Sequence, residues 1–199
     1  MIRHSPAAER NKAAILQALL ALLPAQGRML ELAAGTGQHA RHFASHLPGW
    51  QWLPSDPDPL ALASINALRQ QGANPNLLPA LQLDVLALDW PLTQTVDAIY
   101  CANMLHIAPW ACCAALMQGA ARWLAPQGQL ITYGPYLVNG EATAPGNLAF
   151  DADLRARNAD WGIRWLHEVQ AQALTAGLRL VHDQAMPANN RQLVFGRAP

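Results

Sequence analysis

The chain has 199 residues, 52% of them hydrophobic, which is enough to bury one full core and fits a single domain over residues 1–199. Thirteen basic and thirteen acidic residues give a formal net charge of zero, and the absence of a long basic run argues against a nucleic-acid partner. Only 13% of the residues are charged and seven are Trp, which indicates broad burial and leaves a homo-oligomer open.

The first 27 residues predict one helix. Ser5 and Pro6 form an N-cap and first-turn pair, and the apolar residues within 6–23 fall on one helical face. Basic residues before the apolar run 13–23 also give it a faint likeness to a secretory signal peptide, but no small-x-small cleavage site follows. We therefore expect residues 1–27 to be a helix of the domain. No stretch is long enough to span a membrane.

The three cysteines, Cys101, Cys112 and Cys113, are odd in number and form no C-x-x-C pair. They predict small core residues in a reducing compartment, and hence a cytoplasmic protein.

Strand-like apolar runs alternate with helical patterns through the rest of the chain. The predicted strands are 28–33, 50–55, 80–85, 96–103, 128–134, 178–186 and 191–197. The predicted helices are 6–23, 38–47, 58–71, 110–124 and 162–176. This alternation is typical of an α/β, Rossmann-like, doubly wound fold, with seven mostly parallel strands and helices on both faces. The last two strands are joined by only four residues, so they should form an antiparallel C-terminal hairpin.

The segment 135–160 follows a predicted strand and is long and rich in Gly, Pro and Asn. Loops at that edge of a parallel sheet usually cover a ligand site, so we expect it to be an active-site covering loop.

The most informative segment is the turn that follows the first predicted strand. An apolar strand runs into Gly35-Thr36-Gly37, a helix follows, and Asp56 ends the next strand. Glycines allow the sharp turn and bring bare backbone against a ligand, and Asp56 lies where a carboxylate could accept ribose hydroxyls. Alternatively, the glycines form only a tight turn, and Asp56 caps the helix after it. We favour a nucleoside-cofactor site.

The glycine turn matches the G-x-G-x-x-G/A fingerprint, which by itself leaves a nicotinamide-dependent oxidoreductase open. Two further acids point elsewhere: Glu31 inside the first strand, and Asp84 after the third, where an adenine amino group could be bound or a turn simply closed. Three carboxylates around one ligand suit a sulfonium and an ammonium group better than a pyrophosphate.

These features, with the terminal hairpin, resemble the class I S-adenosylmethionine-dependent methyltransferases over residues 28–197. Seven blocks also resemble a small methyltransferase-like family of unknown function: Ser5–Asn11, Gly35–Ala40, Pro54–Asp56, Asn103–His106, Tyr133–Tyr136, Trp161–Arg164 and Met186–Asn190. The resemblance implies the fold and S-adenosylmethionine as cofactor, but names no substrate. We expect the cofactor to be bound by Glu31, Gly35, Thr36, Gly37, Asp56, Asp84 and Asn103.

Asn103 and His106 follow the fourth strand, where cofactor and substrate meet in such sheets. A neutral imidazole there could take a proton from an attacking oxygen or nitrogen, although it could equally be hydrogen-bonded within its loop. Tyr133 and Tyr136 end the fifth strand and either orient the acceptor or pack.

Other polar groups leave two interpretations open. Arg157, with Arg155 and Arg164, could bind an anionic substrate or form a surface ion-pair network. Arg10 and Asn11 are more polar than a structural helix needs, and we expect them to close over the bound ligands. His39, His42 and His46 share a helix face, but no acid or Cys completes a metal site, so we expect a solvated face.

The sequence therefore predicts a cytoplasmic methyltransferase that moves a methyl group from S-adenosylmethionine to a small molecule, with His106 and Tyr133 as catalytic residues. Arg10, Asn11, Tyr136 and Arg157 are the candidate substrate-binding residues. The alternatives are a NAD(P)-dependent oxidoreductase and a non-catalytic binding or assembly protein with the same fold.

Overall fold

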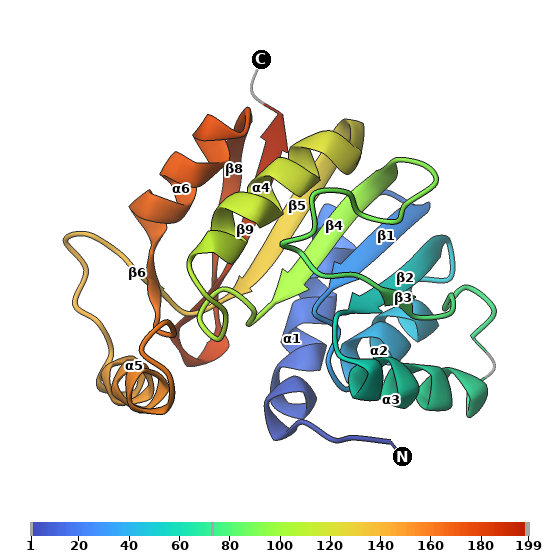
Figure 1. Ribbon diagram of the computed structural model, residues 1–199, viewed down its shortest axis with the longest axis horizontal. Coiled ribbons are helices and arrows are strands. Elements are labelled where there is room, and N and C mark those ends of the chain that lie inside the picture. The colour runs from blue at the N-terminus through green and yellow to red at the C-terminus, as the bar shows by residue number, and fades with distance from the viewer. Residues whose placement is uncertain (1, 73, 198–199) are drawn as a thin grey trace.

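The computed structural model describes residues 2–72 and 74–197, which form one seven-stranded sheet covered by helices (Figure 1). The strand order is β3-β2-β1-β4-β5-β9-β8. The sheet strands are β1 (Gly27–Leu32), β2 (Trp50–Asp56), β3 (Leu81–Gln82), β4 (Val96–Ala102), β5 (Leu124–Gly134), β8 (Leu178–Met186) and β9 (Asn190–Arg197). All neighbours pair in parallel except β9, which is antiparallel to both β5 and β8. The expected doubly wound sheet with a terminal hairpin is confirmed.

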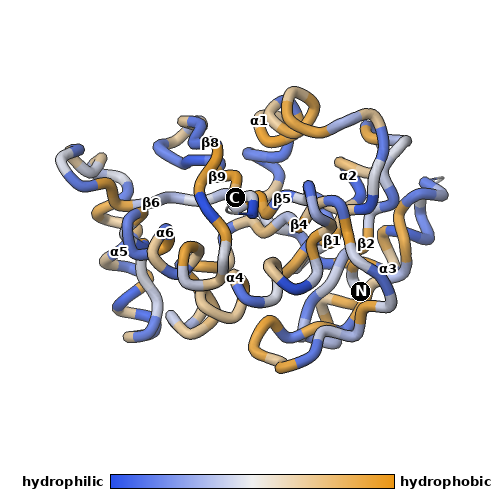
Figure 2. Tube along the Cα trace, turned by 90° about the horizontal axis from the view of Figure 1, so that it is seen from above, coloured by the Kyte–Doolittle hydropathy of each residue, from blue (hydrophilic) through white to orange (hydrophobic). Residues whose placement is uncertain are grey.

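Helices cover both faces of the sheet, as the continuous apolar strands require. They are α1 (Pro6–Leu22), α2 (Gln38–His46), α3 (Pro59–Gln70), α4 (Ala111–Trp123), α5 (Pro145–Arg157) and α6 (Leu166–Thr175). Figure 2, seen from above, shows α1 and α2 on one side of the sheet and α4 and α6 on the other. Central strands such as β1 and β4 are therefore buried on both faces, which explains their lack of polar alternation.

Each face has its own hydrophobic cluster. One cluster joins α1 and α2 to Met29, Tyr100 and Ile131 of the sheet. The other joins α4 and α6 to Leu30, Ile99 and Leu130, each of which is directly adjacent in its strand to a residue of the first cluster. The period of two along each strand therefore assigns alternate side chains to opposite clusters.

The N-terminal helix forms where it was expected. Ser5 caps α1, because its hydroxyl accepts a hydrogen bond from the Ala8 amide at 3.2 Å, and Pro6 opens the first turn. In the part of the chain that the structure describes, no helix is both long and apolar enough to cross a bilayer.

Two predicted elements are shorter in the structure than the sequence indicated. The third strand is only two residues long, Leu81–Gln82, where 80–85 was expected. The last helix begins at Leu166 and not at 162, because Arg164–Trp165 forms strand β7, which pairs in parallel with β6 (Tyr136–Leu137).

The interpretation of 135–160 as a loop was wrong for half of its length, because Pro145–Arg157 forms α5. Pro145 starts the helix, and pairs at i,i+4 spacing, Asp151–Arg155 and Asp153–Arg157, support it. Only Leu154 of this helix is buried, so its apolar periodicity is weak and the composition read as a loop.

Candidate functional site

The carboxyl ends of β1, β2, β4 and β5 meet at one edge of the sheet, and most of the predicted site residues, but not Tyr136 and Arg157, lie there. The turn after β1 is tightly wound: Ala33, Gly35 and Gly37 all have φ in the left-handed region, at 51°, 57° and 84°. At Gly37 a Cβ would lie 3.0 Å from the Ile65 Cα, whereas at Gly35 its nearest neighbour would be 3.9 Å away. Gly37 is thus required by packing of α2 on α3, and Gly35 leaves bare backbone accessible.

Asp56 holds this turn against β2. Its Oδ2 accepts the Gly35 amide at 2.8 Å and its Oδ1 accepts the Asp58 amide at 2.9 Å. The helix-capping alternative for Asp56 is wrong, because Asp58 is the N-cap of α3 and accepts the Leu60 amide. A carboxylate has about four acceptor positions, so two remain for ribose hydroxyls.

Glu31 lies beneath the turn and is 2% exposed. The indole N–H of Trp52 donates to its Oε2 at 2.6 Å. Burial raises the pKa of Glu31 to about 8, although the Trp52 hydrogen bond opposes the shift. Burial therefore favours the uncharged form of Glu31, which weakens the expected trio of carboxylate charges.

Asp84 lies after β3 and is exposed. Its Oδ1 accepts the Leu86 amide at 2.9 Å, so the turn-closing interpretation holds, while its other oxygen has no such partner among the described residues.

The start of α1 is tied to the glycine turn by side chains. The Ser5 amide donates to Gln38 Oε1, which also accepts the Thr36 hydroxyl, and the Arg3 amide donates to Ser64 Oγ. Gln38 was missed in the sequence, although its place directly after Gly37 could have indicated it. The residues before α1 therefore pass over the turn.

Asn11, in α1, lies beside two other elements, α2 and β5, whereas Arg10 is exposed. The Asn11 Oδ1 lies 2.7 Å from His39 Nε2 in a hydrogen bond. Burial raises the pKa of Tyr133, and the polar side chain of Asn11 opposes that rise. The expectation of a solvated histidine face was wrong for His39, which is buried with a pKa lowered by desolvation to about 4.

His106 lies in the loop after β4 and is 5% exposed. A Cβ on Gly134 would lie 3.4 Å from its Nδ1 and 3.7 Å from Asn103 Oδ1, so both side chains border the end of β5. Asn103 has φ 60° and donates its amide to the Tyr133 carbonyl at 2.8 Å. Burial first, and then the charge of Arg164, lower the pKa of His106 to about 4.

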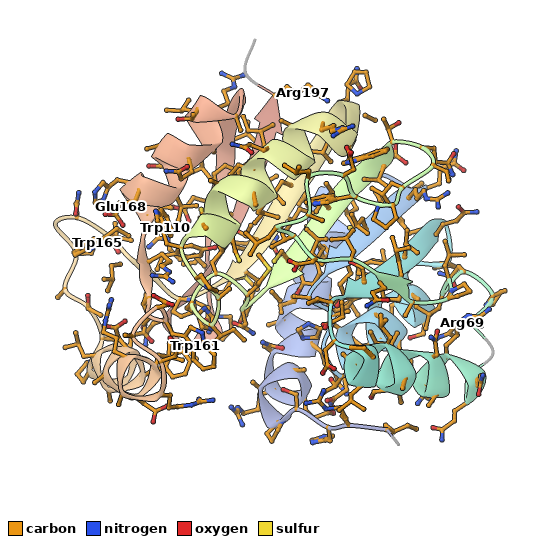
Figure 3. The ribbon with its side chains drawn as sticks, viewed as in Figure 1. Arg69, Trp110, Trp161, Trp165, Glu168 and Arg197 are labelled. Atoms are coloured by element: carbon orange, nitrogen blue, oxygen red, sulfur yellow. The ribbon has the colours of Figure 1, made fainter. Side chains whose placement is uncertain are left out.

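Tyr136 and Arg157 lie apart from this group. The Tyr136 hydroxyl hydrogen-bonds Thr132 Oγ1 at 2.8 Å within the core on the α4 side, which is the packing alternative. Arg157 is exposed, 3.7 Å from Asp153, and its guanidinium stacks 5.2 Å from the centroid of Trp161 (labelled in Figure 3). This is the ion-pair alternative, and it leaves Arg157 on the outer side of α5.

Two cavities adjoin the site without filling it. One of about 510 Å³ lies between α1, α2 and the end of α3, and its α2 wall consists of Gln38, Arg41, His42 and Ser45. Another, of about 260 Å³, lies between the segment 138–147 and the β8–β9 turn, beside Arg191, which pairs with Gly134. Within residues 2–72 and 74–197 no group of three or more His, Cys, Asp or Glu side chains is arranged to hold a metal ion.

Several solved structures that are similar to this chain are methyltransferases. CalO1, a methyltransferase in calicheamicin biosynthesis solved in its SAH-bound form, is 16% identical with a TM-score of 0.81, and the match covers 96% of this chain and 54% of CalO1. The mitomycin 7-O-methyltransferase MmcR is 16% identical with a TM-score of 0.82 over 96% of this chain and 55% of its own. Human N-acetylserotonin methyltransferase, solved with SAM, is 16% identical with a TM-score of 0.79 over 97% and 53%.

The chain therefore spans about half the length of these structures and has the fold of the class I S-adenosylmethionine-dependent methyltransferases, as the sequence resemblance predicted. It belongs to the family described as protein of unknown function DUF938, whose model matches residues 2–197.

Proposed function

We propose that this protein transfers a methyl group from S-adenosylmethionine to a small-molecule acceptor. The observation that carries the proposal is the pairing of Asp56 with the Gly35 amide, at the strand edge where His106 also lies. The buried carboxylate of Asp56 lies beside accessible backbone at Gly35, and the imidazole of His106 lies at the ends of the neighbouring strands. Two of the structures with this fold were solved with S-adenosylmethionine or its demethylated product, which supports the choice of cofactor.

The residues of the turn fit a nucleoside ligand. The two remaining acceptor positions of Asp56 would take the ribose hydroxyls, and the second oxygen of Asp84 would take an adenine amino group. Thr36 and the backbone at Gly35 and Gly37 would line the amino-acid part. Asn103, in the left-handed conformation after β4, would close the site from the other side.

Glu31 would act from beneath, as a neutral hydrogen-bonding group held by Trp52. The charge complementarity for a cationic ligand then comes mainly from Asp56 and Asp84, which lowers the electrostatic attraction that three carboxylates would give.

When bound, S-adenosylmethionine supplies a methyl group that is already activated, so the protein mainly aligns the acceptor and excludes water. His106 would receive the proton that the acceptor oxygen or nitrogen loses as it becomes methylated. Because its pKa is about 4, His106 is neutral at pH 7 but is a weak base, which favours acceptors whose proton is already acidic. Asn11 and Tyr133 would position the acceptor, with Arg10 at the rim.

Ligand-induced stabilisation separates this function from the alternatives. Saturation with S-adenosylhomocysteine at about one hundred times its Kd should stabilise the fold by about 2.7 kcal/mol, a rise in Tm of about 5–10 °C for this size. A response to NAD or NADP alone would identify an oxidoreductase. No response to any of these ligands would leave a binding or assembly protein.

The variant Asp56→Asn tests the acid directly. An amide offers fewer acceptor positions and one unwanted donor, so S-adenosylhomocysteine affinity should fall about 10- to 100-fold, measured by calorimetry. The matched control is Asp89→Asn, which removes an exposed acid paired with Arg122 and should leave affinity unchanged. Equal affinity in the two variants would remove Asp56 from the binding site.

A further inference from the structure

The loop that carries His106 is held from a segment far along the chain. Arg164, in β7, donates from Nε to the Leu105 carbonyl at 2.9 Å and from Nη2 to the Ala108 carbonyl at 2.8 Å. These two carbonyls lie on either side of His106. The amide of Gly162 donates to the carbonyl of His106 itself at 3.0 Å.

The same segment is fixed from α5. Asp151 accepts the Ile163 amide with Oδ1, and its Oδ2 accepts Arg155 Nε at 2.8 Å. The Arg164 guanidinium also donates to the Asp160 carbonyl at 2.6 Å and stacks 5.5 Å from the centroid of Trp110. Figure 3 shows Trp110 at the start of α4, so the guanidinium is enclosed between α4 and the segment after α5.

Only an arginine can make this set of contacts. Its planar fork presents donors in fixed directions, so one side chain reaches carbonyls of two different segments. A lysine would keep the charge but offers a single ammonium centre, which cannot bridge Leu105, Ala108 and Asp160 together.

The charge of Arg164 acts on the imidazole as well as on the loop. His106 stacks edge-on against Phe150, with ring centroids 5.5 Å apart, and no described residue hydrogen-bonds its ring nitrogens. Arg164 donates to carbonyls on both sides of His106, and Gly162, whose amide holds the His106 carbonyl, lies against the ion pair of Asp151 and Arg155. A cation close to an unpartnered buried imidazole favours its neutral form.

We propose that Arg164 is a positioning residue for His106: its guanidinium fixes the loop 103–110 at the end of β5 and places a positive charge beside that loop. The part concerning proton transfer rests on the proposed function. The loop and charge effects do not depend on it, since they can be measured without cofactor or acceptor.

The test is a histidine-detected NMR titration combined with amide hydrogen exchange on the full chain. Arg164→Gln removes both the positive charge and the planar guanidinium. In this variant His106 should titrate at higher pH than in the wild type, and the backbone amides of 105–108 should exchange about tenfold faster or more. In Arg164→Lys, exchange should rise in the same way while the His106 titration stays low. The control Arg157→Gln removes a guanidinium that stacks on Trp161 and should change neither quantity.

The outcomes separate the two proposals. An unchanged titration and unchanged exchange in Arg164→Gln would overturn the positioning role, as would the same changes in Arg157→Gln. If Arg164→Gln does not fold, Arg164→Lys decides, because wild-type exchange rates at 105–108 in that variant would show that the fork is not needed. If the wild type fails to bind S-adenosylhomocysteine, the proposed function is wrong, while the titration and the exchange rates still test whether Arg164 positions His106.

Discussion

The proposed site has two halves, one for the cofactor and one for the acceptor, and they are built in different ways. The cofactor half, from the end of β1 to the start of α3, is fixed by backbone turns and by an acid only 21 residues from the amide that it binds. The acceptor half, around His106, is fixed by Arg164, which is 59 residues from the Leu105 carbonyl that it holds. The first half follows from local conformation and is recognisable as a motif, whereas the second depends on contacts between distant segments.

The largest expected effect separates these halves by activity. His106→Ala should lower turnover by about two to four orders of magnitude and leave the affinity for S-adenosylhomocysteine unchanged, because the imidazole belongs only to the acceptor half. The measurement is initial rate against a methyl acceptor, with calorimetry for the cofactor. His182→Ala, which removes an exposed histidine of β8, is the control. A parallel fall in cofactor affinity would show that the halves are not independent.

The next effect concerns Glu31, which lies under the cofactor half. Its pKa is raised from 4.5 to about 8, so between these values the unfolded chain ionises the group and the folded chain does not. This contribution to stability is fully present below about pH 4.5 and is lost as pH rises towards 8, by up to about 1.4 kcal/mol per pH unit.

Glu31→Gln should reduce this pH dependence and keep a carbonyl oxygen that accepts the Trp52 indole N–H. The free energy of unfolding of the variant should therefore increase relative to that of the wild type as pH rises. Urea unfolding at pH 5, 6.5 and 8 measures it. Glu168→Gln, an exposed acid of α6, should keep the wild-type slope. A wild-type slope in Glu31→Gln would mean that Glu31 is ionised in the folded protein.

A smaller effect tests how far the cofactor half depends on the backbone conformation of the glycine turn. Gly37→Ala combines left-handed strain with a Cβ placed 3.0 Å from Ile65, and should cost about 2–5 kcal/mol of unfolding free energy. Gly140→Ala has a similar φ of 79° but meets no atom within 4 Å, and should cost only about 1–2 kcal/mol. Denaturant titration of the two variants gives the difference, and equal costs would mean that α2 shifts to accept the methyl group.

Much of the architecture could be read from short-range patterns. The Ser5 cap, the apolar strands around Leu30 and Ile99 and the short link that makes β8 and β9 antiparallel each depend on neighbouring residues only, and all appear in the structure. Helix α5 could not be read in this way, since a helix that buries only Leu154 has almost no apolar periodicity.

The site divides along the same line. The positions of Gly35, Gly37 and Asp56 at one turn followed from spacing, because the carboxyl ends of adjacent parallel strands necessarily meet. The burial of Glu31 against Trp52 did not, because indole and carboxyl are brought together only by the register of β1 on β2. His39 was misread for the same reason, since its partner Asn11 comes from another helix.

The sequence alone determined most of the strands and helices, the glycine turn and the acid beside it, because backbone conformation and apolar periodicity are local properties. The tertiary structure alone decided the burial of Glu31, the partner of His39 and the contacts of Arg164. Protonation and hydrogen-bond partners depend on burial and on which distant segments pack together, and these are set only when the sheet and its helices have assembled.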